Sequence, residues 1–292
     1  AFKRKTRTEA HVGREFSVAF LILMFLVLTL TFALPSVESR ISGASSFPRV
    51  IDQAYVPTTI AAASLPVKPD QTLPDWIDAL NWMRNNLPSD AVVLSWWDYG
   101  YWITTIANKT TLTDNATLNS TQIAMTGRFF MSNETGAMQI LSTFNSYARN
   151  RGDSSKVTYV VAFFTFDGSG KDIGYGEESK WRWMANIAFN SLDYYKHYGN
   201  YTLGKDWVDT NKNGQPDSQD QFPVNATGAN TVLYQFLQWG KSKRVSSITF
   251  QKPPNFPFDL VYWSQRDSSS VVTAGGINAL VSVFKVIYPP KT

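Results

Sequence analysis

An uncharged run of nineteen residues, Phe16–Leu34, constrains this chain more than any other feature of its sequence. At a rise of about 1.5 Å per residue, a helix of this length spans roughly the hydrocarbon core of a bilayer. Residues 1–14 hold five Lys or Arg and one Glu, so the net charge of +4 is concentrated before the run. The positive-inside rule then predicts a cytoplasmic segment over 1–15, a transmembrane helix over 16–35, and the remainder on the extracytoplasmic face of the cell membrane.

A cleaved secretory signal peptide is the alternative for this apolar run. Its apolar core would be shorter, and no small-x-small cleavage site follows Leu34. Because basic and acidic residues balance over the rest of the chain, the basic excess indicates a membrane boundary, and we expect no nucleic-acid partner. The chain begins at Ala1 without a Met, so we expect it to be part of a longer protein.

Strand and helix patterns alternate after the membrane segment. Apolar residues recur at helical spacing over 73–87, and short apolar runs such as 91–94 have the composition of buried strands. This alternation predicts an α/β (mixed α+β) globular fold. In chain order we expect a connector over 36–72, an α/β core over 73–198, an inserted polar loop over 199–228, and a C-terminal helix with a β-rich part over 229–292.

The chain contains no cysteine, so an extracytoplasmic domain must be held together by its core, by bound ions or by partners. Six Asn-x-Thr sequons indicate exposure to a glycosylating compartment. The candidate glycosylation sites are Asn108, Asn115, Asn119, Asn133, Asn200 and Asn225.

Trp96, Trp97 and Asp98 follow a predicted buried strand and precede a predicted helix, a place where α/β sheets bind ligands. Indole N–H groups only donate hydrogen bonds and a carboxylate only accepts them, so the trio suits a small hydroxyl. A site built around a hydroxyl rejects an analogue that lacks it by up to ~10⁴-fold. On residue types alone, the alternative is that Asp98 caps the following helix and the tryptophans belong to the core.

The longer string Ser95-Trp-Trp-Asp-Tyr-Gly-Tyr101, with Asp114-Asn115-Ala-Thr-Leu-Asn119-Ser-Thr121 after it, resembles the soluble domain of oligosaccharyltransferase catalytic subunits. The archaeal AglB form is the most similar, and the resemblance covers roughly residues 73–190. It implies that Trp96, Trp97 and Asp98 bind the Ser or Thr hydroxyl of an acceptor sequon, two residues after the glycosylated Asn.

A second family motif, a helix with D-x-x-K-x-x-x-M/I, resembles Glu177-x-x-Lys180-x-x-x-Met184. In the family this helix completes the hydroxyl pocket, and a flexible thioether at Met184 would suit the methyl group of Thr. Lys180 and Met184 share one helix face. Glu177 stands where the family usually has Asp, which leaves the role of this acid open. The alternative is a solvated Glu177–Lys180 pair with Met184 in the core.

A polar segment from Asp209 to Asp220 follows the D-x-[DN]-x-[DN]-G spacing of a calcium loop, with Gly214 at the sixth position. The candidate ligands of a structural Ca²⁺ are Asp209, Asn211, Asn213, Gln215, Asp217 and Asp220. Asp stands at position twelve in place of the usual Glu and no strong helix flanks the segment, so we expect a loop and not an EF-hand. The alternative is a solvated Asn/Gly turn.

The resemblance implies a glycosyltransferase, a dolichyl-phosphooligosaccharide–protein glycotransferase that moves a lipid-linked (dolichyl-phosphate or dolichyl-diphosphate) oligosaccharide to Asn of N-x-Ser/Thr sequons. Amide attack needs carboxylates and a divalent metal, Mn²⁺ or Mg²⁺. The family supplies them from loops between earlier membrane helices, so we expect no catalytic residue in this chain. We expect an acceptor polypeptide as partner here, with the lipid-linked oligosaccharide bound outside this chain. The alternative is a membrane-anchored, calcium-stabilised surface or carbohydrate-binding protein without catalysis.

Overall fold

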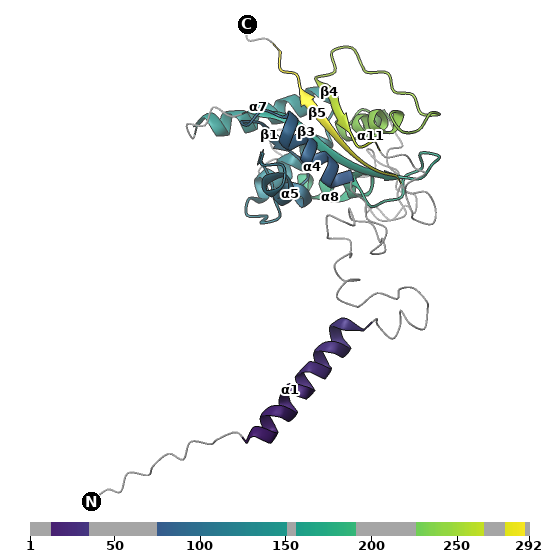
Figure 1. The fold of residues 1–292 in the computed structure, drawn as a ribbon. Helices are drawn as coiled ribbons and strands as arrows, with labels where there is room; N and C mark the ends of the chain where they lie inside the picture. The colour runs from purple at the N-terminus through teal and green to yellow at the C-terminus, as the bar shows by residue number, and fades with distance from the viewer. Residues whose placement is uncertain (1–12, 35–74, 151–155, 191–225, 266–277, 290–292) are drawn as a thin grey trace, which may run out of the picture.

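One mixed sheet organises the globular part of the protein. The computed structural model describes residues 13–34, 75–150, 156–190, 226–265 and 278–289. Within these ranges the strands are β1 (Val92–Leu94), β2 (Thr110–Thr111), β3 (Val157–Phe166), β4 (Phe258–Trp263) and β5 (Asn278–Val286). They lie in the order β2-β1-β3-β5-β4 (Figure 1). β1 runs parallel to β2 and β3, whereas β5 runs antiparallel to β3 and β4. The predicted mixed α/β fold is confirmed.

Helices occupy the segments between these strands, close to where the periodicity predicts them. In chain order they are α4 (Asp75–Asn86), the 3₁₀ turn η2 (Trp97–Tyr99), α5 (Gly100–Thr105), α6 (Ser120–Phe130), α7 (Glu134–Asn150), α8 (Glu177–Asn190), α10 (Ala226–Ala229) and α11 (Val232–Ser242). α10 begins inside the segment predicted as a polar loop over 199–228, whose preceding residues lie outside the described ranges.

Both faces of the sheet are covered by helices. On β3, Phe163 packs against Trp76 of α4, with ring centroids 5.7 Å apart. Phe284 of β5 is paired with Val160, which has the opposite parity to Phe163, so Phe284 points to the other face. There it stacks on Phe236 of α11 at 3.9 Å. α4 and α11 therefore cover opposite faces, and the core lies on both sides of β3 and β5.

The β-rich C-terminal part completes the central sheet and is not a separate layer. β5 pairs with β3 from Tyr159 to Phe166, and β4 adds the outer edge (Figure 1). β5 therefore depends on a partner more than a hundred residues earlier in the chain, and β4 pairs in turn with β5. This long-range pairing has no signature in the local sequence pattern.

The apolar N-terminal run is helical. α1 (Arg14–Leu28) continues into the π-helical turn η1 (Thr29–Ala33), and none of their residues is buried. By length and composition this helix can cross a membrane, a property that it shares with signal sequences. The predicted connector over 36–72 and the basic residues of the first twelve positions lie outside the described residues.

Candidate functional site

The aromatic trio lies on the turn that leaves the carboxyl end of β1. Trp96 is only 2% exposed, whereas Trp97 and Asp98 are half-buried. The two indole rings lie 6.3 Å apart at 49°. Trp96 is thus a core residue, and Trp97 and Asp98 carry the part of the turn that solvent can reach.

Asp98 does not cap the helix that follows it. Neither η2 nor α5 has a side-chain hydrogen bond from its own N-cap residue, Trp96 or Tyr99. The prediction that Asp98 could simply be an N-cap is therefore wrong, because its carboxylate is engaged elsewhere.

The Asp98 carboxylate binds Lys180, which lies on the first turn of α8. Lys180 Nζ donates to Asp98 Oδ2 at 2.5 Å and to the hydroxyl of Tyr99 at 2.7 Å. The Lys180 and Asp98 side chains are 18% and 29% exposed, so the pair is shielded but open on one side. The two motifs that the sequence placed 82 positions apart therefore meet in one site.

Two buried glutamates place α8 against the sheet. β1 is short, and the N–H groups of Phe163 and Thr165 on β3 lie beyond its end. Glu177 Oε2 accepts from Phe163 N at 2.5 Å, and Glu178 Oε2 accepts from Thr165 N at 3.1 Å. These bonds satisfy buried amides that would otherwise lack partners. A Cβ on Gly176 would lie 2.5 Å from the carbonyl oxygen of Phe163, so the approach requires glycine.

The electrostatics of this cluster follow from its burial. Burial raises the pKa of Glu177 to about 8, although the charge of Lys180 and hydrogen bonds from Phe163 N–H and Tyr99 act in the opposite direction. Burial, followed by the charges of Glu177 and Asp98, raises the pKa of Tyr99 well above its ordinary value of 10. Tyr99 therefore remains a protonated phenol that can accept from Lys180.

Gly100 is required where the turn meets the segment after β2. A Cβ on Gly100 would lie 2.3 Å from the carbonyl oxygen of Thr113 and 2.5 Å from Cα of Asp114. Thr113 Oγ1 also donates to the carbonyl of Ser95 at 3.0 Å. The segment Thr113–Asn115 therefore packs directly on the turn, and we call it the strap.

The other two predicted residues of the hydroxyl pocket, Met184 and Glu177, are buried. Met184 is fully buried, and a Cβ on Gly127 of α6 would lie 2.7 Å from its carbonyl oxygen. The core alternative for Met184 describes its position. Glu177 is also fully buried, so the alternative of a solvated Glu177–Lys180 pair is wrong, and its carboxylate contacts β3 and not solvent.

The described sequon asparagines are exposed, and two of them make local hydrogen bonds. Asn119 caps α6 by accepting from Gln122 N at 3.1 Å, and Asn133 accepts from Gly136 N at 2.9 Å. Asn108 adopts a positive φ of 52°. Asn200, Asn225 and all six candidate calcium ligands lie outside the described residues, so these sites remain predictions. Among the described residues no group of three or more His, Asp or Glu could hold a metal ion.

Sequence reasoning missed three residues of this site. Tyr99 was read only as part of the motif, although its hydroxyl binds Lys180. Glu178 follows Glu177 directly, and two adjacent acids before an amphipathic run could have suggested a pair at the helix start. Asn115 was assigned only as a sequon, yet its side chain contacts the turn.

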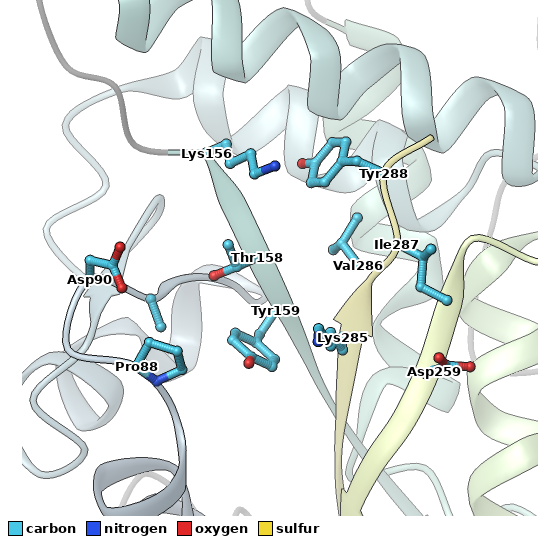
Figure 2. Close-up of a pocket in the computed structure, with 11 residues that line it drawn as sticks. Pro88, Asp90, Lys156, Thr158, Tyr159, Asp259, Lys285, Val286, Ile287 and Tyr288 are labelled. Carbon is cyan, nitrogen blue, oxygen red and sulfur yellow. The ribbon is translucent and has the colours of Figure 1, made fainter. Parts of the chain in front are cut away.

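A separate cavity of about 660 Å³ lies at the amino ends of β1 and β3 (Figure 2). Its lining includes Lys156, Tyr159, Lys285 and Tyr288, and none of the predicted site residues. Because the aromatic turn leaves the carboxyl end of β1, this cavity lies at the opposite end of the strands from the turn.

The chain is similar to proteins of known family over the region that carries this site. A family model described as the STT3/PglB/AglB core domain matches residues 89–168, which include the aromatic turn and all of β3. The chain is homologous to STT3/PglB/AglB oligosaccharyltransferases. It is 35% identical over 223 residues to an Oryza sativa dolichyl-diphosphooligosaccharide–protein glycosyltransferase subunit STT3B, covering 74% of this chain and 27% of the relative. It is 31% identical over 235 residues to subunit STT3 of Saccharomyces cerevisiae, covering 74% and 30%.

The homologues are thus named as subunits of a glycosyltransferase, and this chain spans less than a third of the length of either. Among solved structures, it is similar to the C-terminal globular domain of an oligosaccharyltransferase from Archaeoglobus fulgidus, at 24% identity and a TM-score of 0.40, covering 74% of this chain and 98% of that one.

Proposed function

We propose that this chain binds the acceptor polypeptide of protein N-glycosylation and holds the Ser or Thr hydroxyl of its sequon at Asp98. The observation that carries this proposal is the ion pair between Lys180 and Asp98, at the end of β1 and open to solvent on one side. The homology of the region around this turn to the oligosaccharyltransferase core supports it.

The chemistry of the pair suits a hydroxyl. Lys180 binds Oδ2 of Asp98, and among the described residues no donor contacts Oδ1. Oδ1 can therefore accept the O–H of a Ser or Thr, while the third N–H of Lys180 can donate to the same hydroxyl oxygen. Trp97, half-buried beside Asp98, supplies an apolar wall for the Thr methyl group. An acceptor peptide with Ala in place of the Ser or Thr would leave the partly desolvated carboxylate of Asp98 without a hydroxyl partner.

Trp96 and Met184 act behind this surface in our proposal. Both are almost fully buried, so they shape the pocket from within. Glu177 likewise holds α8 in place without touching the acceptor.

The remaining functions of the enzyme are also part of the proposal. The full enzyme would transfer a lipid-linked oligosaccharide to the acceptor Asn, and Mn²⁺ or Mg²⁺ held outside this chain would supply electrophilic activation. α1 would anchor it in the cell membrane with the globular part on the extracytoplasmic face, by the charge distribution around the helix. We keep the archaeal AglB type and the structural Ca²⁺ at Asp209–Asp220 as further proposals.

Peptide binding to the full chain in detergent micelles tests the acceptor role. An Asn-x-Thr peptide is expected to bind at least about tenfold more tightly than the matching Asn-x-Ala peptide, and Asp98→Ala should remove the difference. Equal affinities of the wild-type chain for both peptides would overturn the proposal and favour a surface or carbohydrate-binding protein.

A glycosyl-transfer assay tests the division of labour within the enzyme. The chain supplied with lipid-linked oligosaccharide, Mn²⁺ and acceptor peptide is expected to show no transfer. Robust turnover would show that catalytic carboxylates are present among its own residues.

A further inference from the structure

The helix that follows the acceptor turn is capped by a residue from a distant loop. The N-cap residue of α5, Tyr99, has no side-chain capping bond. The first-turn N–H of Tyr101 instead donates to Asn115 Oδ1 at 3.4 Å. Tyr101 is the second residue of α5, a position whose N–H an N-cap side chain usually accepts. Asn115 therefore fills the capping position from fourteen residues further along the chain.

The same carboxamide also binds the backbone of Asp98. Asn115 Nδ2 donates to the Asp98 carbonyl at 3.0 Å, so the side chain bridges both ends of the turn between Asp98 and Tyr101. The strap that carries Asn115 is itself ordered, because Asp114 Oδ1 accepts from Ala116 N at 2.9 Å. Its contact with Gly100 leaves no space for a side chain. The amide is therefore held in place before any acceptor arrives.

We propose that Asn115 is a positioning residue of the acceptor site. It caps α5 in place of Asp98 and so leaves the Asp98 carboxylate to Lys180 and the acceptor hydroxyl. Asp98 and Tyr101 have the spacing of an N-cap residue and its N3 position, so without Asn115 the aspartate can itself cap the helix. A carboxylate turned toward its own helix is lost to the acceptor. This inference rests on the proposed function.

Asn115 also begins the sequon Asn115-Ala116-Thr117. A glycan attached to Asn115 Nδ2 would replace one of the two hydrogens of this NH₂ group. The same NH₂ group donates to the Asp98 carbonyl. The sequon and the positioning role therefore use the same atom. Substitution of Thr117 separates them, because it abolishes the sequon and keeps the carboxamide.

The experiment measures the affinities of the full chain for the Asn-x-Thr and Asn-x-Ala peptides by fluorescence anisotropy. Asn115→Ala is expected to lower the preference for Thr about two- to tenfold, the range expected for one or two exposed hydrogen bonds. Thr117→Ala should keep the wild-type preference. Asn115→Asp, which keeps a capping oxygen, should retain a stronger preference than Asn115→Ala.

The ratio of the two affinities separates positioning from folding, since general destabilisation weakens both peptides alike. An unchanged ratio in Asn115→Ala, or an equal loss for both peptides with a lowered Tm, would overturn the proposal. Equal effects of Asn115→Ala and Thr117→Ala would assign the role to a glycan instead. An Asn115→Asp preference no greater than that of Asn115→Ala would overturn the capping role. A wild-type chain that binds the Asn-x-Thr and Asn-x-Ala peptides equally would overturn the proposed acceptor function, and this result is distinct from failure of the Asn115 proposal.

Discussion

Lys180 Nζ lies 2.5 Å from Oδ2 of Asp98, although 82 positions separate the two residues. The contact exists because Glu177 and Glu178 bind the amides of β3 that β1 leaves unpaired. The helix that carries Lys180 is therefore fixed to the same strand end from which the aromatic turn departs. Both partners of this pair are carried by backbone packed on the core, Asp98 by the turn after β1 and Lys180 by the helix that Glu177 and Glu178 bind to β3.

Replacing Lys180 should weaken acceptor binding. Lys180→Met keeps much of the aliphatic length and removes the donor to Asp98, so the affinity for an Asn-x-Thr peptide is expected to fall about three- to tenfold, a modest effect because the pair is partly solvated. The matched control is Lys285→Met, at an exposed lysine beside the cavity at the opposite end of the strands (Figure 2). Equal peptide affinities of the two variants would show that Lys180 does not take part in acceptor binding.

Removing the phenol oxygen of Tyr99 should destabilise the fold. Tyr99→Phe keeps the ring contact with Trp76 at 4.3 Å but removes the acceptor of Lys180. The expected loss in the free energy of unfolding is about 1–3 kcal/mol, because buried polar groups lose a partner. Denaturant unfolding followed by tryptophan fluorescence measures it. Tyr101→Phe, at a residue that is 47% exposed, serves as control, and an equal loss in both variants would contradict the prediction.

The stability of the protein should fall as pH rises from about 5 to 8. Burial raises the pKa of Glu177 from 4.5 to about 8, so in this window the folded chain holds a proton that the unfolded chain releases. Burial raises the pKa of Glu178 as well, which adds a slope of the same sign. Glu177→Gln mimics the protonated acid and should flatten the dependence.

Unfolding free energies at several pH values test this expectation. Glu134→Gln, in the first turn of α7, is the matched control and should keep the wild-type slope. A wild-type stability that increases between pH 5 and 8 would show that the buried carboxyl is ionised throughout.

A side chain at Gly100 should disrupt the turn. The added Cβ of Gly100→Ala would meet the backbone of Thr113 at 2.3 Å, and backbone cannot move aside as a flexible side chain can. We expect a loss of at least about 2 kcal/mol in unfolding free energy together with loss of acceptor preference. Gly168→Ala has no atom within 4 Å of the new Cβ and should be nearly neutral. Similar melting temperatures for the two variants would refute the close approach.

Local patterns were sufficient to predict most elements of the fold. Helical spacing over 73–87 predicted α4, the apolar run at 91–94 predicted β1, and the expected C-terminal helix is α11, because periodicity and residue type report on burial within one segment. The position of Trp96, Trp97 and Asp98 at a strand end also followed from adjacent residues. Residues 209–220 could not be assessed in the same way, because they lie outside the described ranges.

The sequence by itself determined the apolar N-terminal helix, the order of strands and helices, and the residues that could bind a hydroxyl. Only the tertiary structure decided that Lys180 pairs with Asp98, that Asn115 caps α5, and that Trp96 and Met184 are buried. The physical reason is that these contacts join segments far apart in the chain. They depend on close approaches at Gly100, Gly127 and Gly176 that no local pattern encodes.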